Sequence, residues 1–128
     1  MSIHFKLVPR KNPQKPDDPP KYYAQVVPTD KKDLKSLSED VSRHTTMSAA
    51  DVYGVLMALE EEIIAALKGG AQVELGSLCI FYPDLKGDGA ESPDAFNASS
   101  HIKRKGIRIR AKQVLARQME DVPVEKID

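Results

Sequence analysis

The sequence has no tryptophan, only three phenylalanines and a single cysteine, Cys79. One cysteine cannot form an internal disulfide, so we expect a reducing compartment, the cytoplasm. No apolar run approaches the length of a membrane-spanning helix, and residues 1–6 lack the apolar core of a signal peptide. We therefore expect a cytoplasmic protein with no membrane partner, whose small aliphatic core is completed by a partner chain.

The sequence also lacks an excess of either charge. It has 19 Lys and Arg residues against 19 Asp and Glu residues, a formal net charge of zero. This balance argues against a uniformly basic protein that coats DNA. A local basic surface remains compatible with it, because local fields attract polyanions even when the total charge is zero.

Recognisable catalytic motifs are absent as well. The three histidines are far apart, and none has a partner at metal-ligand spacing: His4, His44 and His101. Cys79 alternates with apolar neighbours as a packed strand residue does, and the Gly69-Gly70 pair follows a helix pattern where a phosphate-binding loop would precede one. We expect no enzyme activity, no cofactor, no metal and no small-molecule substrate.

The chain divides by composition into three segments. Residues 1–29 form an N-terminal extension with two expected strands, 3–8 and 22–27, and residues 120–128 form a tail. Between the two strands lies a segment with five prolines, which excludes a helix. This segment is basic and includes Arg10 and Lys11. Two interpretations stay open for it, a connector between strands or a loop that contacts DNA.

The middle segment, residues 30–119, begins with two helical patterns. Leu34, Leu37 and Val41 form one apolar stripe. Ser48, followed three residues later by Asp51, is typical of a helix N-terminus. The second helix carries a broad apolar face and stops at Gly69-Gly70. So broad a face usually packs on more than one neighbour, which indicates a dimer core.

Strand patterns follow the helices. Residues 73–82 alternate as a half-buried strand, with a bulge or turn at Gly76, and residues 102–110 alternate again. The polar residues 83–101 between them form either a flexible arm or a hairpin. Residues 112–119 are expected to form a short helix.

The strongest functional signal is a run of six cations in ten residues without one acid: Lys103, Arg104, Lys105, Arg108, Arg110 and Lys112. Arginine on alternate strand positions projects one guanidinium roughly every 6–7 Å along a face, close to the spacing of phosphates on a DNA strand. The guanidinium is suited to gripping a phosphate or entering a narrow minor groove. The alternative is an ordinary solvated strand face paired with acids.

The order of these elements resembles that of the bacterial histone-like HU/IHF proteins over residues 30–119. Residues 33–41 resemble the first helix of that family, 46–52 its interhelix turn, and 63–76 its helix-to-strand segment. Phe81 falls where the family's Gly-x-Phe motif places its aromatic residue, with Cys79 in place of the glycine. Residues 5–13 and 21–24 make the chain similar to a divergent HU-related subgroup with an N-terminal extension.

The resemblance implies an α+β fold that forms an intertwined homodimer, with two helices, a saddle of strands, a protruding arm and a short C-terminal helix. It also implies an architectural, nucleoid-associated protein that contacts double-stranded DNA with little sequence preference. Lys86 lies in the arm, and Pro93 is the candidate wedge between base pairs. Such insertion costs a few kcal/mol of unstacking, offset by wrapping more DNA around the protein.

Two departures from the family pattern concern DNA contact. The arm carries one lysine, Lys86, against four acids: Asp84, Asp88, Glu91 and Asp94. Ala111-Lys112 also stands where the family has Pro-Gly-Lys. These departures support an alternative function, a protein-interaction or scaffolding module that keeps the HU fold with weak or lost DNA affinity.

Overall fold

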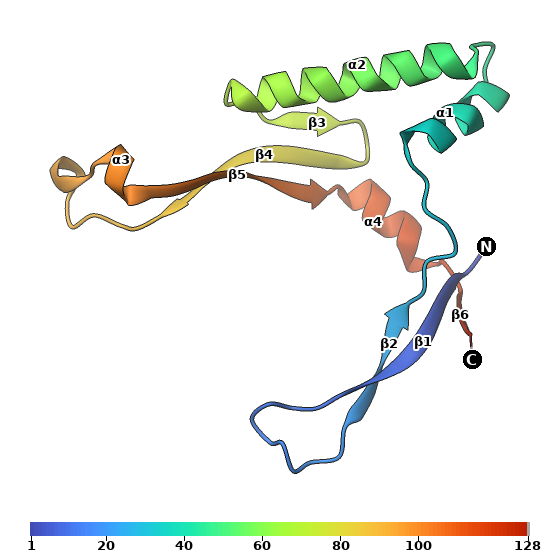
Figure 1. The fold of residues 1–128 in the computed structure, drawn as a ribbon, viewed down its shortest axis with the longest axis horizontal. Helices are drawn as coiled ribbons and strands as arrows, with labels where there is room; N and C mark the ends of the chain where they lie inside the picture. Colours follow the sequence, from blue (N-terminus) through green and yellow to red (C-terminus); the bar gives the residue numbers. More distant parts are fainter. Residues whose placement is uncertain (128) are drawn as a thin grey trace. The chain divides into compact units, whose positions relative to one another are not determined.

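The computed structural model describes residues 1–127. The chain forms two compact units (Figure 1). The terminal unit contains Met1–Asp33 together with the segment that starts at Gln118, and the central unit is Leu34–Arg117. The expected α+β class is confirmed, because helices and two separate three-stranded sheets are both present.

The terminal unit is a sheet of strand order β2-β1-β6. Strands β1 (Ile3–Arg10) and β2 (Lys21–Val26) pair antiparallel, and β6 (Val124–Lys126) pairs parallel with β1. Two further hydrogen bonds of 2.9 Å close the ends of the β1–β6 ladder. The backbone N–H of Ile3 donates to the carbonyl of Pro123, and that of Ile127 donates to the carbonyl of Phe5. The sequence predicted no strand after residue 120. Three residues are too few to show a period, and their partner lies at the other end of the chain.

Two helices open the central unit. Helix α1 (Leu34–Arg43) packs against α2 (Ala49–Lys68). The predicted cap of α2 is confirmed, because the Ser48 hydroxyl accepts a hydrogen bond of 3.1 Å from the backbone N–H of Asp51. The predicted stop is confirmed too, since the N–H of Gly69 donates to the carbonyl of Ala65.

The central sheet has strand order β3-β4-β5 and is antiparallel throughout. Strands β3 (Val73–Leu75) and β4 (Cys79–Gly87) are joined by a turn in which Gly76 has φ of +54°, a conformation that favours glycine. Strand β5 (Ile102–Ala111) pairs along the full length of β4. Helix α2 contacts β3 and β4 and lies along this sheet in Figure 1.

Beyond the sheet, β4 and β5 extend together as an arm (Figure 1). Its tip contains a 3-10 helix, η1 (Pro93–Ala95), and one turn of α-helix, α3 (Ala98–His101). The segment expected as a flexible arm or a hairpin is therefore an arm whose two strands are paired and whose tip contains two short helices. Helix α4 (Gln113–Glu120) follows β5 and contains the division between the two units.

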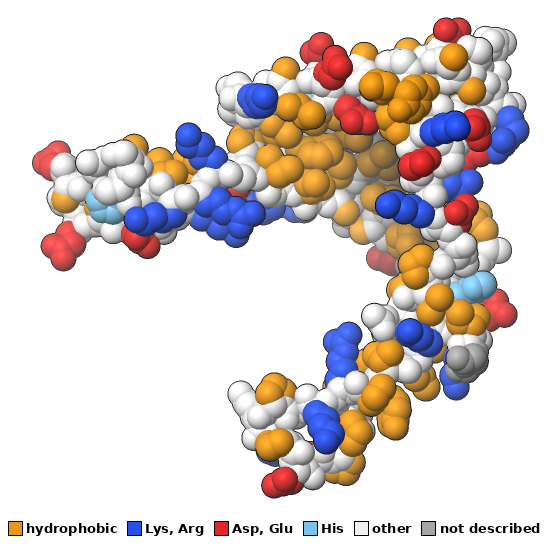
Figure 2. Space-filling view, viewed as in Figure 1, with side chains coloured by type: hydrophobic (Ala, Val, Ile, Leu, Met, Phe, Trp, Pro, Cys, Tyr) orange, Lys and Arg blue, Asp and Glu red, His pale blue; other side chains and the backbone are white. Residues whose placement is uncertain are grey.

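Very little of this chain is buried. Within residues 1–127 only Val52 and Ser38 are inaccessible, at 5% and 1% exposure. Apolar side chains of α2 and of the central sheet that the alternation assigns to a core face remain exposed, including Val55, Leu59, Ile64, Leu85, Ile107 and Ile109. Figure 2 shows hydrophobic side chains gathered over the region where α2 meets the sheet. A single chain therefore leaves much of its apolar face uncovered.

Candidate nucleic-acid interface

The pairing of β4 with β5 decides which cations share a face. Residues directly opposite each other in an antiparallel pair point to the same side of the sheet. Lys86 is paired with Arg104, Tyr82 with Arg108, and Ile80 with Arg110. We call the surface formed by Lys86, Arg104, Arg108 and Arg110 the basic face. All four side chains are exposed, and Figure 2 shows Lys and Arg side chains along one edge of the arm.

The basic face has an ordered centre. The Cζ atom of Arg108 lies 5.0 Å from the centroid of the Tyr82 ring, within the range of a cation–π contact. The contact holds the guanidinium against the sheet while leaving its N–H groups open to solvent. Two acids share this side of the sheet: Asp84, paired with Gly106, and Glu74 of β3, which is opposite Ile80 and forms an ion pair with Lys112.

Like charges also face each other on this surface. Lys86 and Arg104 are directly opposite, an arrangement that is destabilising without a counterion between them. Neither side chain takes part in an ion pair within the described part of the chain. The basic face is therefore a surface whose own repulsion an anion would relieve.

The other predicted cations of this segment lie elsewhere. Lys105 is paired with Leu85 and so points to the opposite, apolar side of the sheet, where it lines a groove of about 610 Å³ with Ile64 and Ile107. The Nζ atom of Lys103 lies 3.9 Å from a carboxylate oxygen of Asp88. The alternation of β5 thus divides a run of charges that looks continuous in the sequence.

Lys112 is held by its own sheet. Its ammonium group forms an ion pair with Glu74 and donates a hydrogen bond of 3.1 Å to the carbonyl oxygen of Gly76. These two partners fix Lys112 beside the β3–β4 turn. Any anion that binds Lys112 must compete with the Glu74 carboxylate.

The arm tip is built around an aromatic pair. Pro93 is the first residue of η1, and the rings of Phe96 and His101 stack with centroids 5.0 Å apart and planes at 23°. Asn97 caps α3 by accepting the backbone N–H of Ser99 at 3.0 Å. Phe96 is 46% exposed. Sequence reasoning missed Phe96, although an isolated aromatic residue in a polar arm is a signal that could have found it.

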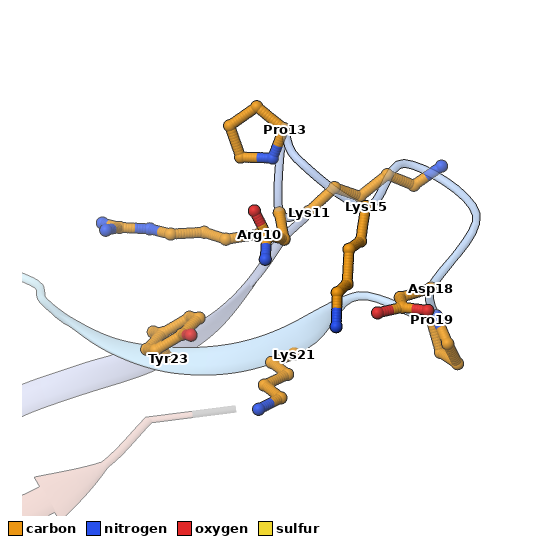
Figure 3. Close-up of a pocket in the computed structure, with 9 residues that line it drawn as sticks. Arg10, Lys11, Pro13, Lys15, Asp18, Pro19, Lys21 and Tyr23 are labelled. Atoms are coloured by element: carbon orange, nitrogen blue, oxygen red, sulfur yellow. The ribbon is translucent and has the colours of Figure 1, made fainter.

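Arg10 and Lys11 belong to the terminal unit. They lie where β1 leads into the proline-rich loop and line a hollow at that end of the β1–β2 hairpin (Figure 3). The Cζ atom of Arg10 is 5.6 Å from the centroid of the Tyr23 ring.

Neither a metal site nor a membrane span is found among residues 1–127. No group of three His, Cys, Asp or Glu side chains is placed to hold a metal ion there. Within the same residues, no helix is both long and apolar enough to cross a membrane.

Solved structures with a similar fold are known. A candidate bacterial DNA-binding protein from Bacteroides vulgatus matches 99% of this chain at 15% identity, with a TM-score of 0.65. This chain spans about half, 49%, of that protein. HU from Anabaena, crystallised with DNA, matches 70% of this chain and 99% of its own at 17% identity, with a TM-score of 0.55. No curated protein matches the sequence.

The expected HU-like fold is therefore confirmed, with its two helices, central sheet, arm and C-terminal helix. A family model described as an HU domain fused to a winged helix-turn-helix, an immunoglobulin-like domain or a glycine-rich motif matches residues 1–126. The match includes the terminal unit as well as the central one. The chain thus belongs to this divergent HU-related family, HU-HIG.

Proposed function

We propose that this protein is an architectural DNA-binding protein of the bacterial nucleoid that contacts duplex DNA with little sequence preference. The observation that carries the proposal is the basic face, four exposed cations that the β4–β5 register places together on one side of this strand pair, from the central sheet into the arm. Arg108 and Arg110 are two residues apart, roughly 6–7 Å along the strand, so each can meet a different phosphate. The proposed activity is binding without catalysis.

The mode of contact follows from the side chains. Arginine donates a planar fork of N–H groups that matches a phosphate, and such contacts carry no sequence information. Lys103, Lys105 and Lys112 are added as secondary contacts, since they flank the basic face in sequence but point elsewhere or are already paired. HU from Anabaena was crystallised with DNA, which supports duplex DNA as the ligand of this fold.

The active form is a homodimer in this proposal. Val55, Leu59, Ile64, Ile107 and Ile109 are all exposed in the single chain. Fully burying one such side chain stabilises a protein by about 1.5–3 kcal/mol. A second copy of the chain covers this apolar surface and brings a second basic face to the same DNA.

The arm is proposed to bend the duplex. Pro93 begins the short helix at the tip, where a wedge can meet the base pairs, and Lys86 supplies a cation nearer the sheet. Inserting a wedge costs a few kcal/mol per unstacked step. The acids at the tip oppose this contact, so bending is expected to contribute less to affinity than the basic face does.

The test removes the basic face and keeps the fold. The variant Arg104→Gln/Arg108→Gln/Arg110→Gln changes exposed side chains only. The matched control Lys35→Gln/Lys68→Gln/Lys126→Gln removes the same charge from other exposed positions. Each lost phosphate contact makes the slope of log K against log salt shallower by about 0.9. We expect the slope to become shallower by about 3–5 units in the first variant, which removes three of the four basic-face cations of each protomer, and to change little in the control. Equal slopes in both variants would overturn the proposal.

The second candidate is a protein-interaction module that keeps the HU fold. The observation that favours it is that two of the cations already form ion pairs within the chain, Lys103 with Asp88 and Lys112 with Glu74. In that case the wild-type protein is a stable dimer that does not bind duplex DNA even at low salt.

A further inference from the structure

The loop that joins β1 to β2, residues 11–20, has a definite shape. The backbone N–H of Lys15 donates to the carbonyl of Asn12 at 3.0 Å, and that of Asp18 donates to the carbonyl of Lys15 at 3.1 Å. The Asn12 side chain also accepts from the N–H of Gln14 at 3.0 Å. Prolines restrict the loop further by fixing φ. The side chains of this hairpin loop therefore start from an ordered backbone.

Cations surround a hollow at this end of the hairpin. Arg10 and Lys21 are directly opposite in the β1–β2 ladder, and with Lys11 and Lys15 they line a space of about 560 Å³ (Figure 3). Asp18 is the one acid among the described residues that line it. Like charges placed directly opposite destabilise a strand pair.

In the described part of the chain, no carboxylate is paired with these charges. Within residues 1–127, none of Arg10, Lys11, Lys15 and Lys21 forms an ion pair, although Asp18 shares the hollow. All four cations are exposed. Arg10 is held over the ring of Tyr23 at 5.6 Å, so one guanidinium is already positioned. An unpaired group of cations on an ordered loop is suited to binding anionic oxygens.

The exposure of the site indicates what kind of anion occupies it. An exposed lysine binds a single anion weakly because both ions remain hydrated and salt screens them. A polymer of phosphates gains from several such contacts at once, because each releases counterions from the chain. A phosphodiester backbone therefore fits this loop better than an isolated phosphate does.

We propose that the hairpin loop of the terminal unit, with Arg10, Lys11, Lys15 and Lys21, is a second DNA-backbone site, separate from the basic face of the central unit. This inference rests on the proposed function, since it assumes that duplex DNA is the ligand. Each protomer gains at least one phosphate contact from the loop.

The experiment uses the full chain and a duplex of about 30 base pairs. The variant Lys11→Gln/Lys15→Gln/Lys21→Gln is compared with the control Lys6→Gln/Lys35→Gln/Lys126→Gln by fluorescence anisotropy over a range of salt. We expect the slope of log K against log salt to be shallower by about 2 units in the loop variant, for a dimer, and to keep its wild-type value in the control.

A second measurement needs no variant. Acetylation of lysines in the wild-type protein, read by mass spectrometry, is compared with and without the duplex. We expect DNA to protect Lys11, Lys15 and Lys21 and to leave Lys126 as reactive as before.

The possible failures are distinguishable. If changes in the basic face weaken binding while the loop lysines stay reactive and the loop variant keeps its slope, the second site is wrong and the proposed function stands. If the wild-type protein gives no anisotropy change at all, both fail. Protection by phosphatidylserine vesicles and not by DNA would assign the loop to a membrane surface and overturn the inference.

Discussion

The guanidinium of Arg108 lies over the ring of Tyr82, its direct partner across the β4–β5 ladder, at 5.0 Å from the ring centroid. The pair places a cation at the centre of the basic face before any DNA arrives. Immobilising a long side chain on binding costs about 0.5–1.5 kcal/mol. Tyr82 reduces that cost for Arg108 because the side chain is already held.

This relationship predicts an effect of Tyr82→Leu on affinity without an effect on charge. Losing about 0.5–1 kcal/mol in each protomer weakens DNA binding roughly 5- to 30-fold in a dimer, while the salt slope stays the same. Tyr82→Phe keeps the ring and should keep the affinity. A change in slope for Tyr82→Leu, or equal loss in both variants, would show that the ring does not act through Arg108.

The uncovered apolar face predicts that a charge on it prevents dimer formation. Ile64 is 52% exposed and lines the groove beside the central sheet. Ile64→Asp places an ionised carboxylate on the surface that a second copy is proposed to cover, which is strongly unfavourable. We expect a monomer or an unfolded chain by analytical ultracentrifugation. Glu61→Ala, on the same helix, should remain a dimer; a dimeric, folded Ile64→Asp protein contradicts the assignment of the interface.

The cap of α2 predicts a measurable loss of stability. The Ser48 hydroxyl accepts the N–H of Asp51, a group that has no partner within the helix. Ser48→Ala should lower the free energy of unfolding by about 1 kcal/mol in chemical denaturation. Thr46→Ala, two residues earlier, removes a hydroxyl that has no hydrogen bond within residues 1–127 and should change stability by less than about 0.5 kcal/mol. Equal effects of the two substitutions would argue against the cap.

The base of the arm predicts a contrast between two glycines. A Cβ atom on Gly87 would collide with the backbone carbonyl of His101, the same oxygen that accepts the N–H of Asp88 at 2.9 Å. Gly89 has open space around the corresponding position. Gly87→Ala should therefore separate the strands at this point and speed hydrogen exchange of the Asp88 amide several-fold, and Gly89→Ala should not. Unchanged exchange in Gly87→Ala would contradict the close approach.

Local signals in the sequence predicted much of this fold. The start of α2 at Ser48, its stop at Gly69 and the turn at Gly76 each depend on residues within a few positions of one another. The HU-like order of elements followed from the same signals taken together. Strand β6 could not be predicted in this way, because Val124–Lys126 forms only by pairing with β1 at the far end of the chain.

The candidate site was harder to predict for a similar reason. The sequence shows six cations between residues 103 and 112, but their faces depend on the register with β4. That register places Lys86 opposite Arg104 and Lys105 opposite Leu85. The face on which each cation lies also depends on an irregularity between Lys86 and Gly87, where the pairing shifts. The ion pair between Lys112 and Glu74 joins residues 38 positions apart, which no local pattern indicates.

The most direct test of the central claim is fluorescence anisotropy of a duplex of about 30 base pairs, titrated with the wild-type protein at several salt concentrations while its oligomeric state is measured. Four to six phosphate contacts from two basic faces predict binding by a dimer, tolerant of sequence, with a slope of log K against log salt of about −4 or steeper. A stable dimer that leaves the duplex free at low salt would contradict the account and make the basic face a solvated surface of a protein-interaction module.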